Sequence, residues 1–589
     1  MRNPLLLAIA IASLLGAAGC DLTANPRAAQ EAVLACTASG QSGAVWFDSV
    51  SVRAISPAAR TAEPARPEVA PKASIEVKAD VILRQIPRTL YGTNVEWIGN
   101  ANGLWQEGPR RVHPELLRLS RELGVTVVRY PGGLFSDFYH WRNGVGPFER
   151  RPEAQHEPGT RDKSRPNFGT DEALQFAEQL GAELFITVNA GSGTAQEAAD
   201  WVRYVNRDSL RVRHWEVGNE LYIKDGSAMS RRTTVDPAVY ASRFLQFARA
   251  MRAADPRIRI GAIGGENRER YQVVGYPNWN RTVLERAGKE IDFLAVHNAY
   301  APGVFSDPDP DLHTVYRAML AAPVLVARNL DQIARQIAQY APDRAAEIGI
   351  AVTEWGPFFQ ADPSGRYVDH NKTLGSALYA ASTLKALIES PRVEIANFHT
   401  LHDYGIMGWI GSRNNKFPPN PDWAPTARYY ALQLFTRHFG DQLVESATVG
   451  PRYDSEAIGL VGAVRNVPYL DVVASLSADG RRLYILAINK YFDNPIEAEI
   501  TLRGFAADSR ATAWTLNGTG IDAHTGTMPL APSGLRWGRQ VEDSRNPRFS
   551  KGGPREITLA SSPVNDAGAR FTYRFPSHSV TSLELTRAR

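Results

Sequence analysis

Two glutamates in this sequence have the surroundings that acid–base and nucleophilic chemistry require. Glu220 follows Asn219 at the end of residues 214–220, where an alternating strand pattern runs into a turn. Glu354 ends a second, apolar strand pattern over residues 348–354. A carboxylic acid beside an amide can protonate a leaving-group oxygen, and a second carboxylate can act as its partner. Such a pair indicates glycoside hydrolysis better than any other reaction class.

The catalytic interpretation of this pair depends on the elements around it, because an isolated Asn-Glu after a strand usually marks only the start of a helix. Between residues 73 and 440, eight strand patterns are each followed by a helical one, which predicts an α/β fold, the (β/α)8 TIM barrel. Glu220 would follow the fourth strand and Glu354 the seventh, at the end of the barrel where active sites lie. The strands are predicted at 90–97, 125–133, 184–189, 212–216, 258–262, 291–297, 348–353 and 394–398, and the helices at 113–123, 170–180, 195–206, 236–254, 281–289, 325–340, 373–389 and 425–438.

The C-terminal part of the chain, residues 441–589, has a different pattern. Alternating strands such as 483–489 and 498–502 are separated by Gly, Pro, Asn and Asp turns, which predicts an antiparallel β-sandwich. The strand at 75–86 lies outside the barrel count, and we expect it to join this sandwich. A chain of 589 residues is long enough for these two domains.

The N-terminal 20 residues predict a targeting segment. Arg2 precedes an apolar run, Leu5–Leu15, and small residues stand directly before Cys20. This resembles a bacterial lipoprotein signal, in which the cysteine becomes the lipidated first residue. The alternative is ordinary secretion with cleavage nearby. Both predict export to the periplasm or cell surface, and a lipid on Cys20 is the only membrane attachment expected.

Residues 21–72 are predicted to be a tail and linker. The segment 54–72 is rich in Ala, Pro and Arg, as linkers are. Residues 44–52 form one strand pattern that resembles the closing strand of a jelly-roll carbohydrate-binding module. A vestige of such a module and a truncated gene start would both explain it.

Composition limits the classes of partner. The chain is 43% apolar and 22% charged, and its net charge of +4 has no basic run behind it, so nucleic acid and charged membrane surfaces are not indicated. The 12 Trp and 21 Tyr suit a poly- or oligosaccharide substrate, because sugar rings stack on such side chains. No Cys/His cluster has metal spacing and no Gly-rich loop binds phosphate, so we expect no metal or cofactor. Self-association into a homo-oligomer is left open.

Five motifs occur in the order found in α-L-arabinofuranosidases of glycoside hydrolase family 51, which the chain resembles over about residues 75–589. They are Arg129-Tyr130-Pro131-Gly132-Gly133, Gly169-Thr170-Asp171-Glu172, the segment 188–194, the segment 215–220 and Thr353-Glu354-Trp355. The resemblance implies a retaining enzyme that removes arabinofuranosyl side chains from plant polysaccharides or oligosaccharides.

The resemblance also implies roles for individual residues. Glu220 would be the general acid/base, and Glu354 the nucleophile, with their carboxyl groups ~5–5.5 Å apart. Asn219 would bind the hydroxyl next to the anomeric carbon. Arg129, at the end of the second strand, would keep Glu354 ionised, and its alternative role is a buried structural ion pair.

Further substrate-binding residues are expected at other strand ends. Glu96 follows the first strand, His297 and Tyr300 follow the sixth, and Trp355 follows Glu354. The spacing leaves open whether Tyr300 contacts the nucleophile or packs in the core. The two histidines after the eighth strand, at positions 399 and 402, are interpreted as hydrogen-bonded fillers rather than ligands.

Two departures from the family pattern make the sugar less certain than the reaction. Leu134 follows the double glycine where the family usually has Asn, and the segment 397–402 lacks the usual Gln. One alternative therefore keeps the fold and mechanism but acts on a β-linked glycan of the xylan or glucan type. Another is a surface lipoprotein that only binds glycans, which the presence of both carboxylates disfavours.

Overall fold

The computed structural model describes residues 20–24, 32–36 and 70–588, with gaps at 157–160, 225–233, 266–274, 305–306, 308–309, 361–366, 403–406, 413–421 and 528–556. The chain divides into two compact units, Met1–Glu68 and Val69–Arg589. In the first, β1 (Cys20–Ala24) pairs antiparallel with β2 (Ala32–Cys36). The predicted signal segment before Cys20 and the predicted strand at 44–52 lie outside the described residues.

Eight parallel strands close into a barrel, as the sequence predicts. Each strand pairs with the next around the ring, and the pairing of the eighth strand, β16, with the first, β4, closes it. The strands are almost wholly buried because the barrel covers both of their faces. In ring order they are β4 (Gly92–Asn94), β7 (Val127–Tyr130), β10 (Glu183–Val188), β11 (His214–Val217), β12 (Arg259–Ile263), β13 (Phe293–Val296), β15 (Gly349–Phe358) and β16 (Val393–Phe398).

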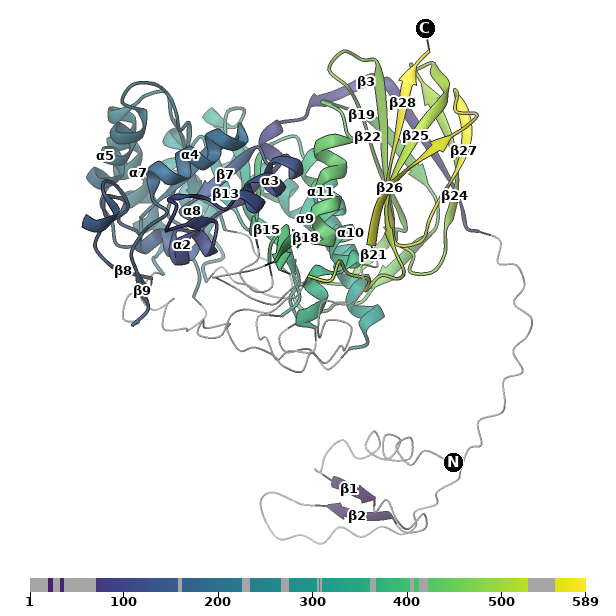
Figure 1. Ribbon diagram of the computed structural model, residues 1–589, viewed down its shortest axis with the longest axis horizontal. Helices are drawn as coiled ribbons and strands as arrows, with labels where there is room; N and C mark the ends of the chain where they lie inside the picture. Colours follow the sequence, from purple (N-terminus) through teal and green to yellow (C-terminus); the bar gives the residue numbers. More distant parts are fainter. Residues whose placement is uncertain are drawn as a thin grey trace. The chain divides into compact units, whose positions relative to one another are not determined.

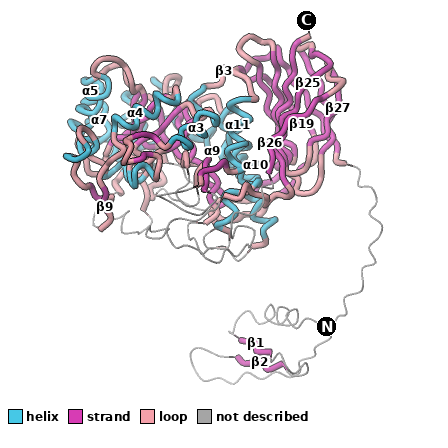
Figure 2. Tube along the Cα trace, viewed as in Figure 1, coloured by secondary structure: helices cyan, strands magenta, loops and turns pink. Residues whose placement is uncertain are grey.

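A helix follows each barrel strand, and these helices lie around the strands (Figure 2). The largest difference from prediction is α9, which begins at Leu312 rather than at residue 325 and includes Pro323. Proline is unfavourable inside a helix, so the sequence pattern indicated only the part after it. The helices are α3 (Pro114–Leu123), α4 (Thr170–Leu180), α5 (Ala195–Asn206), α7 (Pro237–Ala254), α8 (Trp279–Ala287), α9 (Leu312–Tyr340), α10 (Leu374–Glu389) and α11 (Ala427–Arg437).

Strand β15 is longer than predicted and carries Glu354 within it rather than after it. A short strand, β14 (Ala299–Pro302), pairs in parallel with the far end of β15 and supplies the hydrogen bonds that continue it. Ala299 lies opposite Trp355 in this register, so Tyr300 comes close to the carboxyl end of the barrel beside Glu354. The extension therefore places two of the predicted site residues together.

Strand β3 and eight strands from the C-terminal part of the chain form a nine-stranded sheet that curls on itself. Buried side chains from the middle of the sheet and from both sides of it, such as Ile75, Ile485, Ala513 and Phe571, belong to one apolar cluster. The curl thus encloses a core as a sandwich does. The order is β26 (Ile557–Val564), β25 (Ala507–Gly518), β28 (Ser579–Arg587), β23 (Arg482–Asn489), β22 (Leu470–Leu476), β19 (Gln442–Val449), β3 (Lys72–Gln85), β24 (Ile496–Arg503) and β27 (Arg570–Phe575).

Strand β3 is an interior strand of this sheet, although it precedes the barrel in sequence. It pairs antiparallel with β19 and parallel with β24, and Figure 1 shows it in purple among the green strands of the C-terminal sheet. Arg84, near its end, donates hydrogen bonds to the backbone carbonyls of Ser390 and Val393, just before and at the start of β16. The strand therefore holds the two halves of the sheet together and ties the sheet to the barrel.

Among the described residues, none of the helices combines the length and the apolar composition that crossing a bilayer requires.

This position of β3 predicts the effect of truncation. A protein that starts at Pro71 should fold normally, whereas one that starts at Leu90 should lose several kcal/mol of stability or become insoluble, because strand pairing and apolar burial are both lost. Soluble yield and thermal unfolding measure the difference. Equal melting temperatures for the two proteins would contradict the structural role given to β3.

Candidate active site

Arg129 lies at the centre of the carboxyl end of the barrel and is fully buried. Its guanidinium donates to Glu354 Oε1 at 2.9 Å, Glu216 Oε2 at 2.8 Å, Asn219 Oδ1 at 2.8 Å and Asn94 Oδ1 at 3.0 Å. These acceptors come from β15, from β11 and the turn after it, and from β4. A buried guanidinium is tolerated only when its donors are paired in this way. The same hydrogen bonds therefore serve both roles considered for Arg129, the buried structural ion pair and the contact with Glu354.

Glu354 is held as a carboxylate by its neighbours. Besides the bond from Arg129, it accepts a hydrogen bond from Tyr300 Oη to its Oε2 at 2.9 Å. Burial raises the pKa of Glu354, but the charges of His297, His399 and Arg129 and the bond from Tyr300 lower it further, to about 2. An ionised carboxylate at neutral pH is what a nucleophile requires. Of the two roles left open for Tyr300, the structure shows the contact with Glu354.

Glu220 lies on a strained turn directly after β11. Its φ of 39° is in the left-handed region, which a non-glycine residue adopts at a cost, and Gly218 precedes it with a φ of 81°. The Glu220 side chain is 25% exposed, and its Oε1 lies 2.7 Å from His297 Nδ1. One oxygen each of Glu220 and Glu354 and one ring nitrogen of His297 all lie within 4.8 Å of one another. The two carboxyl groups are thus as close as a retaining glycosidase requires.

The bonds of His297 restrict where the proton of this site can lie. Glu216, ion-paired with Arg129, can only accept, so Thr353 Oγ1 donates to it at 2.9 Å. The Thr353 hydroxyl then accepts from His297 Nε2 at 3.1 Å. With Nε2 protonated, one further proton is shared between His297 Nδ1 and Glu220 Oε1. Glu220 can therefore hold a proton or pass it to a neighbouring base.

Glu96 and Asn219, two further predicted site residues, are both buried. Glu96 is 7% exposed, and its Oε2 accepts from Asn102 Nδ2 at 3.2 Å. It packs so closely on Gly132 that a Cβ there would lie 2.5 Å from Glu96 Cγ, and Gly132 has a φ of +93°. Asn219 Nδ2 is buried and has no hydrogen-bond partner among the described residues. A substrate hydroxyl is a suitable acceptor for it.

Comparison with known proteins finds relatives in both sequence and structure. A family model described as the α-L-arabinofuranosidase 1 domain matches residues 119–297. An intracellular exo-α-(1→5)-L-arabinofuranosidase of Halalkalibacterium halodurans is 26% identical over 477 residues, which cover 74% of this chain and 88% of the relative. A probable α-L-arabinofuranosidase C of Aspergillus clavatus is 24% identical over 549 residues, covering 87% and 96%. The chain is thus similar to α-L-arabinofuranosidases over most of its length.

A solved family 51 structure has the same fold. The thermostable α-L-arabinofuranosidase from Thermotoga petrophila superposes with a TM-score of 0.71 at 24% identity, covering 87% of this chain and 100% of that one. Together with the sequence relatives, this fold identifies the chain as a glycoside hydrolase that acts on glycans.

Trp355 is almost completely buried by other aromatic side chains. Its ring is 1% exposed and meets Phe398 and Trp409 edge-on, with ring centroids 5.0 Å and 5.9 Å apart. No face of the indole is open for stacking on a sugar. Substrate binding by Trp355 stays a prediction. Only its Nε1 is suited to this role, because the atom has no hydrogen-bond partner among the described residues.

The two histidines after β16 have different surroundings. His402 Nε2 lies 2.9 Å from the backbone oxygen of Ala101, which fits the predicted filler role. His399 lies 3.9 Å from Glu96 Oε1 instead. Burial lowers its pKa, while the charge of Glu354 and the contact with Glu96 raise it further. His399 is thus part of the site, and its interpretation as a filler was wrong.

Three further residues of the site were missed at the level of sequence. Glu216, Thr353 and Asn94 complete the hydrogen bonds of Arg129 and His297, yet no role beyond membership of a strand or motif was predicted for any of them. A charged residue within a short, otherwise apolar strand, as at Glu216, is the signal that could have identified one of them.

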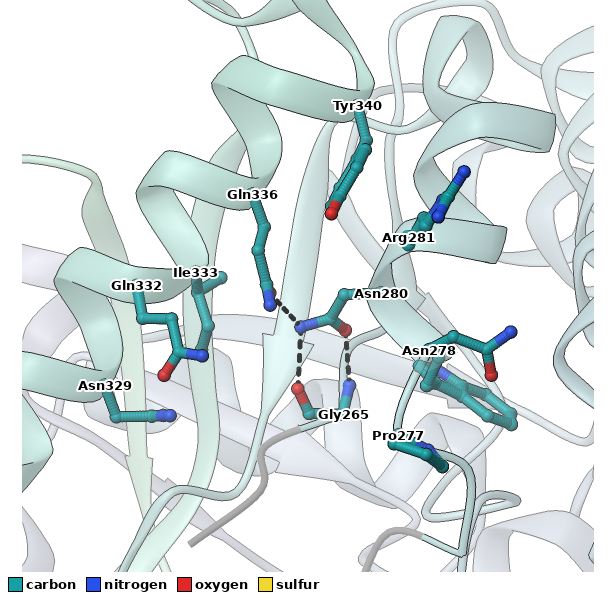
Figure 3. Close-up of a pocket in the computed structure, with 11 residues that line it drawn as sticks. Gly265, Pro277, Asn278, Asn280, Arg281, Asn329, Gln332, Ile333, Gln336 and Tyr340 are labelled. Carbon is teal, nitrogen blue, oxygen red and sulfur yellow. Dashed lines mark hydrogen bonds between the residues drawn. The ribbon is translucent and has the colours of Figure 1, made fainter. Parts of the chain in front are cut away.

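Figure 3 shows a separate cavity of about 190 Å³ between α8 and α9. None of the predicted site residues lines it. Asn280 Nδ2 donates to the carbonyl of Gly265 and to Gln336 Oε1, both at 2.7 Å, and its Oδ1 accepts from the Gly265 amide at 2.7 Å. These bonds fix the chain after β12 to both helices.

Proposed function

We propose that this protein is a retaining α-L-arabinofuranosidase that removes arabinofuranosyl side chains from plant polysaccharides or oligosaccharides. The observation that carries the proposal is the close pair of carboxyl groups: Glu354, ionised and bonded to Arg129, and Glu220, bonded to His297. The names of the matched relatives support the sugar.

In the first step, Glu354 attacks the anomeric carbon while Glu220 protonates the departing oxygen. The covalent ester that forms removes the negative charge of Glu354. Glu216 still pairs with Arg129 at that stage, so the buried guanidinium keeps one carboxylate throughout. In the second step, Glu220 acts as a base toward water, and His297 shares the proton that it takes up.

The alternative of a β-linked glycan substrate is not favoured, because the matched relatives bear α-L-arabinofuranosidase names. The two carboxylates and their supporting hydrogen bonds disfavour a protein that only binds glycans, because binding alone does not require such a pair. Leu134 remains the residue that bears on the sugar. It is half-buried and follows Gly133, where a Cβ would lie 2.4 Å from Glu354 Oε1.

Leu134 provides the test of substrate choice. A hydrogen bond lost with the usual Asn costs about 0.5–1.5 kcal/mol, or roughly a factor of ten, so Leu134→Asn should raise kcat/KM on an aryl α-L-arabinofuranoside by about that factor. The measurement compares wild type and variant on aryl α-L-arabinofuranoside, β-D-xyloside and β-D-glucoside. Leu134→Ala is the control, because it makes room without adding a hydrogen bond. Turnover of another glycoside with none of the arabinofuranoside would reject the proposed sugar.

We also propose that the protein is exported and anchored through a lipid on Cys20. The apolar run and the small residues before Cys20 support this proposal. Labelled palmitate fed to expressing bacteria should enter the wild type and not Cys20→Ser. A wild type that stays unlabelled in the cytoplasm would contradict both export and anchoring. Self-association stays a prediction that a single chain does not test.

A further inference from the structure

We propose that Asp137 is a positioning residue for the acid/base Glu220: it holds the turn that carries Glu220 by accepting backbone amides from two neighbouring loops. The inference rests on the proposed function, because it assigns Asp137 a part in the protonation step. Asp137 was not singled out by the sequence and touches neither carboxylate of the catalytic pair in the described contacts.

The Asp137 carboxylate is 1% exposed and is used fully by backbone donors. Its Oδ2 accepts from the amide of Asn219 at 2.9 Å. Its Oδ1 accepts from the amides of Gly191 at 3.0 Å and Ala190 at 3.2 Å. The donors belong to the loops after β11 and β10, while Asp137 itself follows β7. One buried side chain thus joins three consecutive strand ends.

The loop after β10 fits Asp137 closely. A Cβ on Gly191 would lie 2.8 Å from Asp137 Cβ and 2.7 Å from its backbone oxygen, so only glycine allows this approach. The same oxygen accepts from the amide of Ser192 at 3.1 Å and from its hydroxyl at 3.0 Å. These contacts hold Asp137 in place from the side of the loop after β10, in addition to its bond with the turn that carries Glu220.

The turn that Asp137 holds is the one with backbone strain. Glu220 has a φ of 39°, and such a conformation persists only when its surroundings enforce it. The Gly218 amide is bonded to the carbonyl of Val188 at 3.0 Å, and Asn219 is held through its amide by Asp137 and through Oδ1 by Arg129. Losing the Asp137 bond would leave the Asn219 amide unrestrained. Because Asn219 directly precedes Glu220, the Glu220 carboxyl group would then no longer be oriented toward the leaving oxygen.

The test is the dependence of rate on the leaving group. Asp137→Asn keeps the size of the side chain but turns an N–H donor toward the Asn219 amide. General acid catalysis contributes about 10²–10⁴-fold, and only poor leaving groups need it. We expect kcat/KM to fall roughly 10–100-fold on aryl α-L-arabinofuranosides with poor leaving groups, and by less than about 3-fold on the dinitrophenyl glycoside. Burial raises the pKa of Asp137 to about 7, so the assays belong at pH 8, where wild type is ionised.

Asp255→Asn is the matched control. Asp255 is 5% exposed, precedes β12 at the opposite end of the barrel, and accepts from Asn206 Nδ2 at 3.0 Å. It should lower the melting temperature without changing the leaving-group dependence. Gly191→Ala disturbs the contact between Asp137 and the loop after β10, and it should steepen the dependence of kcat/KM on the leaving group. This second variant provides the test if Asp137→Asn does not fold.

An equal loss on all leaving groups in Asp137→Asn and Gly191→Ala would overturn the positioning role. This outcome differs from failure of the proposed function, in which wild type itself does not hydrolyse arabinofuranosides. The leaving-group series would then be run on whichever aryl glycoside wild type hydrolyses. A protein that hydrolyses none would overturn both proposals.

Discussion

The buried guanidinium of Arg129 is the constraint on which the rest of the site depends. It is removed from water, so its donors need acceptors in fixed directions, and it takes them from three other barrel strands and the turn after β11. Closure of the barrel brings these strands together, and the ion pairs in turn specify how they meet. Removing the guanidinium would leave two buried carboxylates, Glu216 and Glu354, without the arginine that pairs with both.

This arrangement links the two carboxyl groups that do chemistry. From Glu354 the bonds run through Arg129 to Glu216, then through Thr353 and His297 to Glu220. The charge on one catalytic residue is therefore not independent of the proton on the other. Glu216, which performs no chemistry itself, balances Arg129 when Glu354 is neutralised by the sugar. Asp137 adds a second support, acting on the backbone of the turn rather than on its side chains.

The order of strands and helices could be predicted from the sequence because it depends on local periodicity. Apolar runs ending in polar residues indicated both the barrel and the positions of Glu220 and Glu354, and β3 was recognised as extra to the barrel. What local pattern could not indicate depends on contacts between distant segments. The length of β15 is due to pairing with β14, and the length of α9 is hidden by Pro323. The burial of Trp355 likewise follows from Phe398 and Trp409.

The roles of supporting residues were missed for the same reason. The residues next to Glu216 in the chain do not show that it binds Arg129. Those next to Asp137 do not show that it accepts the Asn219 amide. The place of His399 beside Glu96 likewise appears only once β4 and β16 are neighbours. Catalytic groups could be found by their type and position, whereas the groups that orient them require the fold.

The central claim is that Glu354 forms the covalent bond and Glu220 handles the proton. Azide rescue of Glu220→Ala tests it most directly, with an activated aryl α-L-arabinofuranoside as donor and the product identified by NMR. Azide should restore turnover by attacking the glycosyl-enzyme on Glu354, giving a glycosyl azide with the anomeric configuration of the substrate. A glycosyl azide of inverted configuration would mean that Glu220 is the nucleophile, and would contradict the account.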